Sequence, residues 1–204
     1  FHLNFKDDVV SEGFNTVTYT GTGAAQSISG LGLTPDLVWL KERTDADAHL
    51  LFDSVRGANK KIYSNLANAE GTVSDELMSF DADGFTLGTS GNVTTNGNKM
   101  VGWCWDAGTG SAASNTDGSV TSTVKSNTSY GFSIVTYTAT GSGDITVGHG
   151  LGVTPSLIIG KTRNQAYGWR VFHTALGGTK QLSLNSTAAA ATANAWGQTN
   201  PTST

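Results

Sequence analysis

An internal repeat constrains this chain more than any other feature of its sequence. Residues 13–20 (GFNTVTYT) recur as residues 131–138 (GFSIVTYT), and residues 30–35 (GLGLTP) recur as residues 150–155 (GLGVTP). The offset grows from 118 to 120 residues between the two matches, so the length difference falls in the intervening loop. Loops tolerate such differences better than strands or helices do. The chain is therefore expected to contain two copies of one structural unit.

The repeat also sets the expected domain boundaries. We place the first unit at residues 13–107, a linker rich in Gly, Ser, Thr and Asn at 108–130, and the second unit at 131–204. Residues 1–12 are expected to end a preceding segment. The counterparts of residues 85–106 would come after position 204, so the second unit is expected to be incomplete. A continuation of the chain, which we favour, or another segment or subunit would then close its open edge.

Hydrophobic patterning predicts an all-β fold. Residues 14–20 alternate along the chain with β-branched and aromatic side chains, which is typical of a half-buried strand. Residues 37–41 are more uniformly apolar, as in a central strand. Charged residues make up only 14% of the chain, against about 25% in an average globular protein, so Ser, Thr, Asn and Gly must supply the polar surface. We expect two tandem antiparallel β-sandwiches, the second truncated, with short helices only at 67–78 and 187–195.

Charge and hydropathy exclude two classes of partner. The formal net charge is −4, which leaves no basic footprint for nucleic acid. No apolar run reaches the roughly 18 residues of a membrane span, so no membrane insertion is expected. Cys104 is the only cysteine, so no disulfide can form within the chain. Because it lies between two tryptophans and has no basic neighbour, we expect its thiol to be buried and inert.

The sequence contains no motif for catalysis, a metal or a cofactor, and we expect none of the three. Residues 81–84 (DADG) resemble the start of a calcium loop, but Asn92 stands at the twelfth position, where an EF-hand has Glu. A hairpin turn is therefore the favoured interpretation. The four histidines have no metal-ligand spacing: His2, His49, His149 and His173. Nucleophile elbows and phosphate-binding glycine loops are also missing from the sequence.

Tryptophans are the candidate contacts for a sugar ring, because their flat apolar surface can stack on one. Trp103 and Trp105 share one face of a strand, where they either pack in the core, as we favour, or stack on a glycan. Trp39 aligns with an isoleucine of the second unit, which favours a place in the core. Trp169 and Trp196 have no tryptophan counterpart in the first unit. They are therefore the better candidates for a glycan or partner contact.

Two basic pairs are candidates for a charged contact. Lys41 and Arg43 end the central strand of the first unit, and Lys161 and Arg163 occupy the matching positions in the second. Strand alternation places each pair on one face. A solvated strand end is the ordinary role of such charges, and their recurrence favours a shared structural role. The alternative is a contact with an acidic glycan or a neighbouring subunit.

Five strings of the sequence, taken together, carry a family resemblance. They are GFNTVTYT (13–20), GLGLTPDLVWLK (30–41), LLFDSVRG (50–57), SFDADGFTLG (79–88) and GWCWDAG (102–108). The chain resembles a repeat domain of tail-fibre and virion structural proteins of marine bacteriophages, including cyanophages. The resemblance covers nearly the whole chain from Gly13. It implies a β-rich virion component within a long polypeptide, and it carries over no catalytic or binding residue.

From the repeat and this resemblance we expect a structural component of a phage virion, most simply a tail fibre or adhesin segment contributing to host-surface attachment. Such a protein is assembled in the bacterial host cytoplasm and acts in the extracellular particle. The expected partners are other virion proteins, further copies in a homo-oligomer such as a trimer, and a host cell-surface glycan bound with avidity.

Two other function classes compete with this expectation. The first alternative is a non-catalytic carbohydrate-binding module of a secreted polysaccharide-degrading enzyme. The second is a depolymerising tailspike, which would need two carboxylates about 5–9.5 Å apart. No carboxylate pair recurs between the two units, so we expect no enzyme activity.

Overall fold

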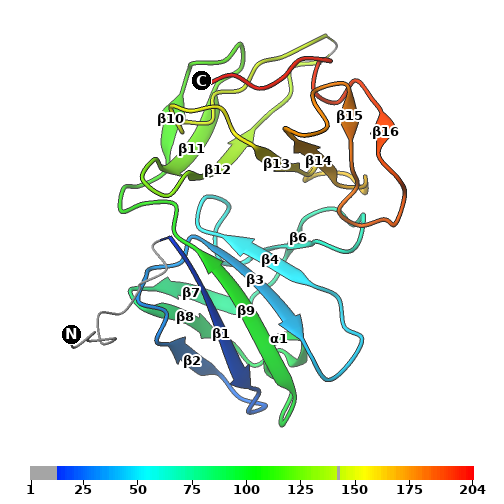
Figure 1. The fold of residues 1–204 in the computed structure, drawn as a ribbon. Helices are drawn as coiled ribbons and strands as arrows, with labels where there is room; N and C mark the ends of the chain where they lie inside the picture. Colours follow the sequence, from blue (N-terminus) through cyan, green and yellow to red (C-terminus); the bar gives the residue numbers. More distant parts are fainter. Residues whose placement is uncertain (1–12, 142) are drawn as a thin grey trace, which may run out of the picture.

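The computed structural model describes residues 13–141 and 143–204, and these residues form several antiparallel sheets with one short helix (Figure 1). This confirms the all-β class. Residues 1–12, expected to end a preceding segment, lie outside the described residues. No helix in the described part of the chain is long and apolar enough to cross a membrane.

The first unit is built on a six-stranded antiparallel sheet. Its strand order is β1 (Phe14–Thr20), β9 (Lys99–Trp105), β3 (Leu37–Glu42), β4 (Leu50–Asp53), β5 (Lys60–Tyr63) and β6 (Gly71–Thr72). The last strand of the unit, β9, therefore lies in the middle of the sheet between β1 and β3. The strands expected from the alternating and apolar runs at 14–20 and 37–41 are both present.

A second, three-stranded sheet covers one face of the first. It consists of β2 (Gln26–Ser29), β8 (Gly84–Leu87) and β7 (Leu77–Asp81), with the one-turn helix α1 (Gly91–Thr94) beside it. Asp81 pairs with Gly84 across a tight hairpin, as the turn prediction for 81–84 required. The Asp83 carboxylate accepts hydrogen bonds from the N–H groups of Gly30 and Gly32, so it fastens this turn to a neighbouring loop.

The core of the first unit lies between these two layers. It is made of buried aliphatic and aromatic side chains with Cys104 among them: Ile28, Leu31, Val38, Leu40, Leu50, Phe52, Leu77, Phe85, Leu87 and Val93. Gly102 stands at the centre of β9, and a Cβ added there would lie 3.2 Å from Leu40 and 3.4 Å from Phe85. The glycine therefore allows the two sheets to approach closely.

The second unit is a more open arrangement of short sheets. Its strands are β10 (Ala113–Asn115), β11 (Ser122–Asn127) and β12 (Phe132–Tyr137) in one sheet, β13 (Leu157–Gly160) and β14 (Arg170–His173) in another, and β15 (Lys180–Gln181) and β16 (Ala191–Thr192) in a third. The expectation that residues 108–130 form only a linker was wrong, because β10 and β11 lie within them. Buried and exposed residues alternate at the start of β11, where Ser122 and Val124 are buried, and the strand pairs with β12.

The two units share one hydrogen-bond framework at an offset of 120 residues. The pairing of β3 with β4 begins at Leu37 and Asp53, and that of β13 with β14 begins at Leu157 and His173. The same framework extends to β6 and β16. The Lys60 ammonium donates to the Thr72 hydroxyl over 2.8 Å, and Lys180 donates to Thr192 over 2.9 Å. The helices predicted at 67–78 and 187–195 were wrong, because each segment contributes a short paired strand instead.

The units differ in their second layer. Residues 146–149, which correspond to β2, do not pair with a β8-like strand in the described part of the chain. Instead Val147 bridges to Val120, and the Ser122 hydroxyl donates to the Gly148 carbonyl over 2.9 Å. Trp196 packs edge-on against Phe172 with the ring centres 5.9 Å apart, and so covers part of the face that would otherwise be bare.

Candidate functional site

Buried side chains from both units meet at one contact, which we call the inter-unit face. It is formed by the side of the β3–β4–β5 sheet that faces away from the first core. Leu51 and Ile62 on this side are buried together with Trp169 of the second unit, and Leu184 packs beside them. The Trp169 indole N–H donates to the Tyr63 carbonyl over 2.8 Å. The inter-unit face is therefore both apolar and specific in its hydrogen bonding.

A row of aromatic rings extends the inter-unit face across β3, β9 and β1. Trp39 lies edge-on to Trp103 at 5.8 Å and stacks with Trp105 at 6.5 Å between ring centres. Trp105 contacts Phe14 at 4.8 Å and stacks on Phe132 of the second unit at 6.2 Å. Trp39 was predicted to lie in the core; its ring is half-buried on the outer side of the sheet, where it packs against the buried cluster of Leu51, Ile62 and Trp169.

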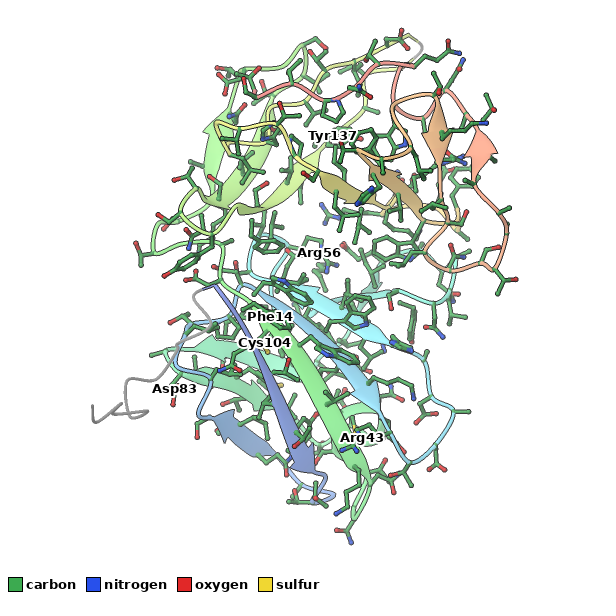
Figure 2. All side chains as sticks on the ribbon, viewed as in Figure 1. Phe14, Arg43, Arg56, Asp83, Cys104 and Tyr137 are labelled. Carbon is green, nitrogen blue, oxygen red and sulfur yellow. The ribbon has the colours of Figure 1, made fainter. Side chains whose placement is uncertain are left out.

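An ion-pair network crosses the inter-unit face. The Glu70 carboxylate accepts hydrogen bonds from Nε and Nη2 of Arg163 at 2.8 and 2.9 Å, and one from Arg56 at 3.1 Å. Arg56 is also paired with Asp53, and the Glu70 N–H donates to the Arg163 carbonyl over 2.7 Å. Burial alone would raise the pKa of Glu70, but the hydrogen bonds from Arg163 and Arg56 outweigh it and hold that pKa below its usual value. Figure 2 shows Arg56 where the two units meet.

A second polar connection is centred on Asp36, which is almost fully buried. Its carboxylate accepts hydrogen bonds from the Ser54 hydroxyl at 2.5 Å, the Ala107 N–H at 2.9 Å and the Lys125 ammonium on β11 at 2.6 Å. One carboxylate thus joins the residues that follow β4 and β9 in the first unit to β11 in the second. A buried charge with three donors is compensated rather than left unpaired.

The two candidate tryptophans, Trp169 and Trp196, both pack against other residues of the chain. Trp169 is only 5% exposed, so its ring is not presented to an external sugar. Trp196 is half-buried against Phe172, and its indole N–H lies buried with no hydrogen-bond partner among the described residues. The aromatic surface that sequence reasoning assigned to an outside partner is therefore directed at the protein itself.

The candidate basic residues divide into two kinds. Lys41 and Lys161 have the same structural role, since each ammonium donates to carbonyls of the loop that follows: Asp45 at 3.0 Å in one unit and Gln165 at 3.2 Å in the other. Arg163 is committed to Glu70. Arg43 is exposed, and Figure 2 places it at the end of the first unit that points away from the second.

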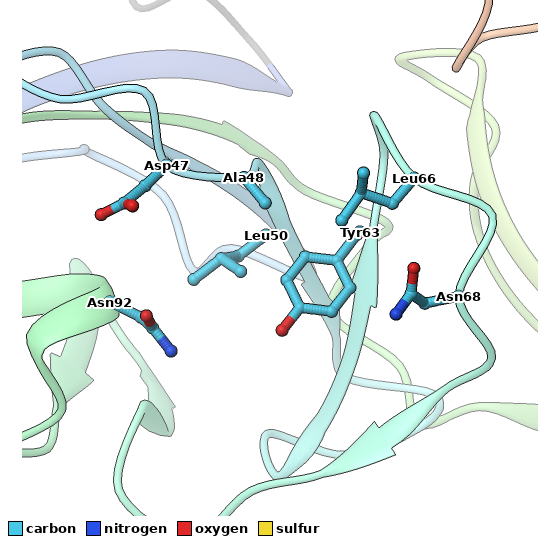
Figure 3. A pocket seen from close by; sticks show the side chains of 7 residues that line it. All are labelled: Asp47, Ala48, Leu50, Tyr63, Leu66, Asn68 and Asn92. Carbon is cyan, nitrogen blue, oxygen red and sulfur yellow. The ribbon is translucent and has the colours of Figure 1, made fainter.

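A hollow on the first unit does not have the features of an active site. It is a shallow depression of about 260 Å³ whose polar lining includes Asp47, Tyr63 and Asn92 (Figure 3). Glu42 lies nearby but is only 2% exposed, and its carboxylate accepts from the Asn98 amide and the Asp45 N–H. Burial raises the pKa of Glu42, and the charges of Asp47 and Asp45 add to this. A polysaccharide cannot reach such a carboxylate to be protonated by it.

The only thiol of the chain is also enclosed. Cys104 is buried, and burial raises the pKa of its thiol to about 12. Within residues 13–141 and 143–204, no three His, Cys, Asp or Glu side chains are grouped so that they could hold a metal ion.

Sequence reasoning missed the residues that hold the inter-unit face together. Glu70 lay in a segment predicted to be helical, and Lys125 lay in the presumed linker. Asp36 is replaced by Ser156 in the second unit, so comparing the repeats gave no reason to select it. The one available signal was that Arg56 sits beside a strand end in an otherwise charge-poor sequence, which suggests a buried ion pair.

Comparison with known families shows to which protein family the chain belongs. A family model described as a domain of unknown function (DUF7483) matches residues 10–204. The chain belongs to this family. No curated protein and no solved structure matches it. The family model covers both units and the inter-unit face as one domain, so the pair of units is the entity whose function has to be explained.

Proposed function

We propose that this domain is a non-catalytic structural module of a phage virion, most simply a segment of a tail fibre or adhesin. The observation that carries the proposal is the inter-unit face, where apolar packing, aromatic stacking and buried ion pairs join two related β-units into one body. Repeated units that bury surface on each other suit an extended, stiff protein. The resemblance to virion repeat domains supports the same role.

The distribution of polar chemistry also supports a structural role. Among the described residues, the carboxylates that accept the most hydrogen bonds, Asp36 and Glu70, connect segments of the chain and do not converge on an open cavity. Catalytic sites instead place perturbed titratable groups in a cleft. The partners of the proposed module are other virion proteins, further copies in a homo-oligomer, and a host glycan contacted by exposed loops.

A carbohydrate-binding module is the less favoured alternative. Such modules present aromatic rings on an accessible surface, whereas Trp169 is buried and the row at Trp39, Trp103 and Trp105 lies at the inter-unit face. Screening the isolated domain on a polysaccharide and glycan array separates the two functions. We expect binding that is weak as a single domain and rises only on multimerisation.

The direct test of the virion role is the composition of purified particles. Mass spectrometry of phage particles from the source of this sequence is expected to find its peptides at a constant ratio to the major tail proteins. Antibodies against residues 13–204 are expected to label the tail or fibres in electron micrographs. Absence of the protein from density-purified particles would contradict the proposal.

A further inference from the structure

Lys61 and Glu76 form an ion pair that lies almost entirely inside the first unit. Lys61 is 6% exposed, Glu76 is 2% exposed, and the ammonium nitrogen lies 2.5 Å from Oε1 of the carboxylate. Alternation along β5 turns Ile62 to the inter-unit face, so Lys61 and Tyr63 point to the side of the first core. Replacing such a buried pair by apolar residues of similar volume is often neutral or stabilising. Stability alone therefore does not account for this pair.

The second unit does without the ion pair. At the offset of 120 residues, Gln181 stands where the first unit has Lys61, and Trp196 stands where it has Glu76. Trp196 packs on Phe172, so an aromatic ring occupies the position of the buried carboxylate. The shared strand framework consequently does not require the pair, which is a feature of the first unit alone.

A third polar side chain, Asn92 of α1, meets the same carboxylate. Its Nδ2 donates to Oε1 of Glu76 over 2.7 Å. Because Lys61 donates to that same oxygen over 2.5 Å, the two nitrogens are at most 5.2 Å apart, the sum of the two distances. Oε2 of Glu76 is buried and has no hydrogen-bond partner among the described residues. An amine, a carboxamide and a carboxylate with a free acceptor atom therefore lie together.

Backbone contacts hold Asn92 beside Glu76. The Glu76 carbonyl accepts from the Gly88 N–H over 2.7 Å, and the Asp75 carbonyl accepts from the Ser90 N–H over 3.0 Å. A Cβ added at Gly88 would lie 2.3 Å from the Asp75 carbonyl oxygen, so this approach requires glycine. Asn92 follows Ser90 by two residues, and its position is therefore fixed by the segment that carries Glu76.

We propose that Lys61 and Asn92 join in an isopeptide bond, an amide between their side chains, and that Glu76 transfers the protons of this reaction. The Glu76 carboxylate takes one proton from the Lys61 ammonium, and the free amine attacks Cγ of Asn92. Glu76 gives that proton to Nδ2, and the Cγ–Nδ2 bond breaks. The attacking nitrogen loses its second proton through Glu76 to the departing ammonia, which leaves as ammonium. The carboxylate is regenerated, and no oxidant or further reactant is needed.

The surroundings supply what this reaction requires. Burial lowers the pKa of Lys61, but its hydrogen bonds with Glu76 and Tyr63 outweigh burial and raise that pKa overall. The resting pair is therefore ionised, and the short hydrogen bond to Glu76 is the route by which the amine becomes free. A carboxamide is a poor electrophile, but holding it beside the amine is equivalent to a concentration of about 10⁵–10⁸ M.

The departing ammonia has a way out. Asn92 is exposed on the side away from the pair and lines the hollow of Figure 3 together with Tyr63. The bond would tie β5 of the main sheet to α1 of the second layer, so the two layers could not separate there. The chain modifies itself once and turns over no outside substrate, and the inference does not depend on the virion role.

The test begins with the intact mass of the full chain. Loss of ammonia lowers the mass by about 17 Da, and we expect the wild type to show this loss. Lys61→Arg, Asn92→Ala and Glu76→Gln are each expected to show the full mass of their sequence. The matched control is Lys60→Arg, because Lys60 bonds to Thr72 instead and should leave the loss unchanged. Circular dichroism checks that each variant is folded.

Protease digestion of the denatured protein identifies the bond. Trypsin should no longer cleave after Lys61, and because no other lysine or arginine precedes Lys99, the product is residues 61–99. A glutamate-specific protease cuts between positions 61 and 92, at Glu70 and Glu76. The fragments on either side of these cuts are expected to stay covalently joined.

Three outcomes would overturn the proposal. Wild-type protein of full mass that is cleaved after Lys61 would show that the bond does not form. A succinimide at Asn96, which precedes Gly97, would also release ammonia, but it would leave Lys61 cleavable and the fragments separate. Folded Glu76→Gln that loses ammonia as completely as the wild type would refute the role of the carboxylate. If that variant does not fold, the wild type and Asn92→Ala still decide whether the bond exists.

Discussion

Truncating Trp169 is expected to weaken the inter-unit face more than any other single substitution on it. The ring is 5% exposed, packs with Leu51 and Ile62, and donates one hydrogen bond to the Tyr63 carbonyl. Replacing a buried tryptophan by alanine removes its transfer free energy and leaves a cavity, which together cost about 3–5 kcal/mol. Trp169→Phe keeps most of the apolar contact and loses the hydrogen bond, so we expect a cost of about 1–2 kcal/mol.

Urea denaturation followed by far-ultraviolet circular dichroism measures this loss without relying on tryptophan fluorescence. With a slope of about 2–3 kcal/mol per molar urea, the expected loss lowers the midpoint by about 1–2 M. The matched control is Tyr167→Ala, because this nearby aromatic residue is 60% exposed. That substitution is expected to change stability by less than about 0.5 kcal/mol. If Trp169→Ala behaves like the control, the inter-unit face does not contribute as the structure indicates.

Three further predictions concern charged and reactive groups. Because the pKa of Glu70 is lowered in the folded protein, its ion pairs stabilise the fold at pH values above the ordinary pKa of 4.5. That stabilisation is lost as the pH falls through the pKa that Glu70 has in the folded protein. The melting temperature of Glu70→Gln should therefore depend less on pH below 4.5 than that of the wild type. Asp36→Ala should cost about 3–5 kcal/mol because it leaves the Lys125 charge without its partner, while Ser156→Ala at the matching exposed position should be nearly neutral by the same melts. Cys104 should react with iodoacetamide at least about 100-fold more slowly in the folded protein than in urea, because its thiol is buried, and equal rates would contradict the placement of β9.

The sequence was sufficient to predict the local framework of the strands, because that framework follows from short-range patterns. Alternation over 14–20, the apolar run at 37–41 and the turn at 81–84 all appear where they were predicted. Residues 67–78 were misassigned although Gly71 and Thr72 both disfavour helix, because a strand of two residues is too short to leave a periodic pattern. Their conformation is decided by pairing with β5, in which Thr72 lies opposite Lys60 and Gly71 lies opposite Lys61.

The inter-unit face could not be predicted for a different physical reason. Trp169 was singled out because the first unit has no tryptophan at that position, and it was predicted to contact a glycan or a partner. Whether a special aromatic residue faces solvent or a neighbouring unit depends on how two sheets dock, which no periodicity encodes. The docking is set by contacts more than 90 residues apart, such as Arg163 with Glu70.

The geometry of the inter-unit face limits how many units of this kind can be joined through that contact alone. Leu51 and Ile62 lie on β4 and β5 of the first unit, and Trp169 and Leu184 lie next to the corresponding strands β14 and β15 of the second, on the side of each unit that forms the inter-unit face. Once two units have met through that side, neither has it free for a third. An array using only this contact stops at two, so a longer one must alternate it with a different contact. Units would then be added in pairs, and deleting a single unit would expose an apolar surface that deleting two would not.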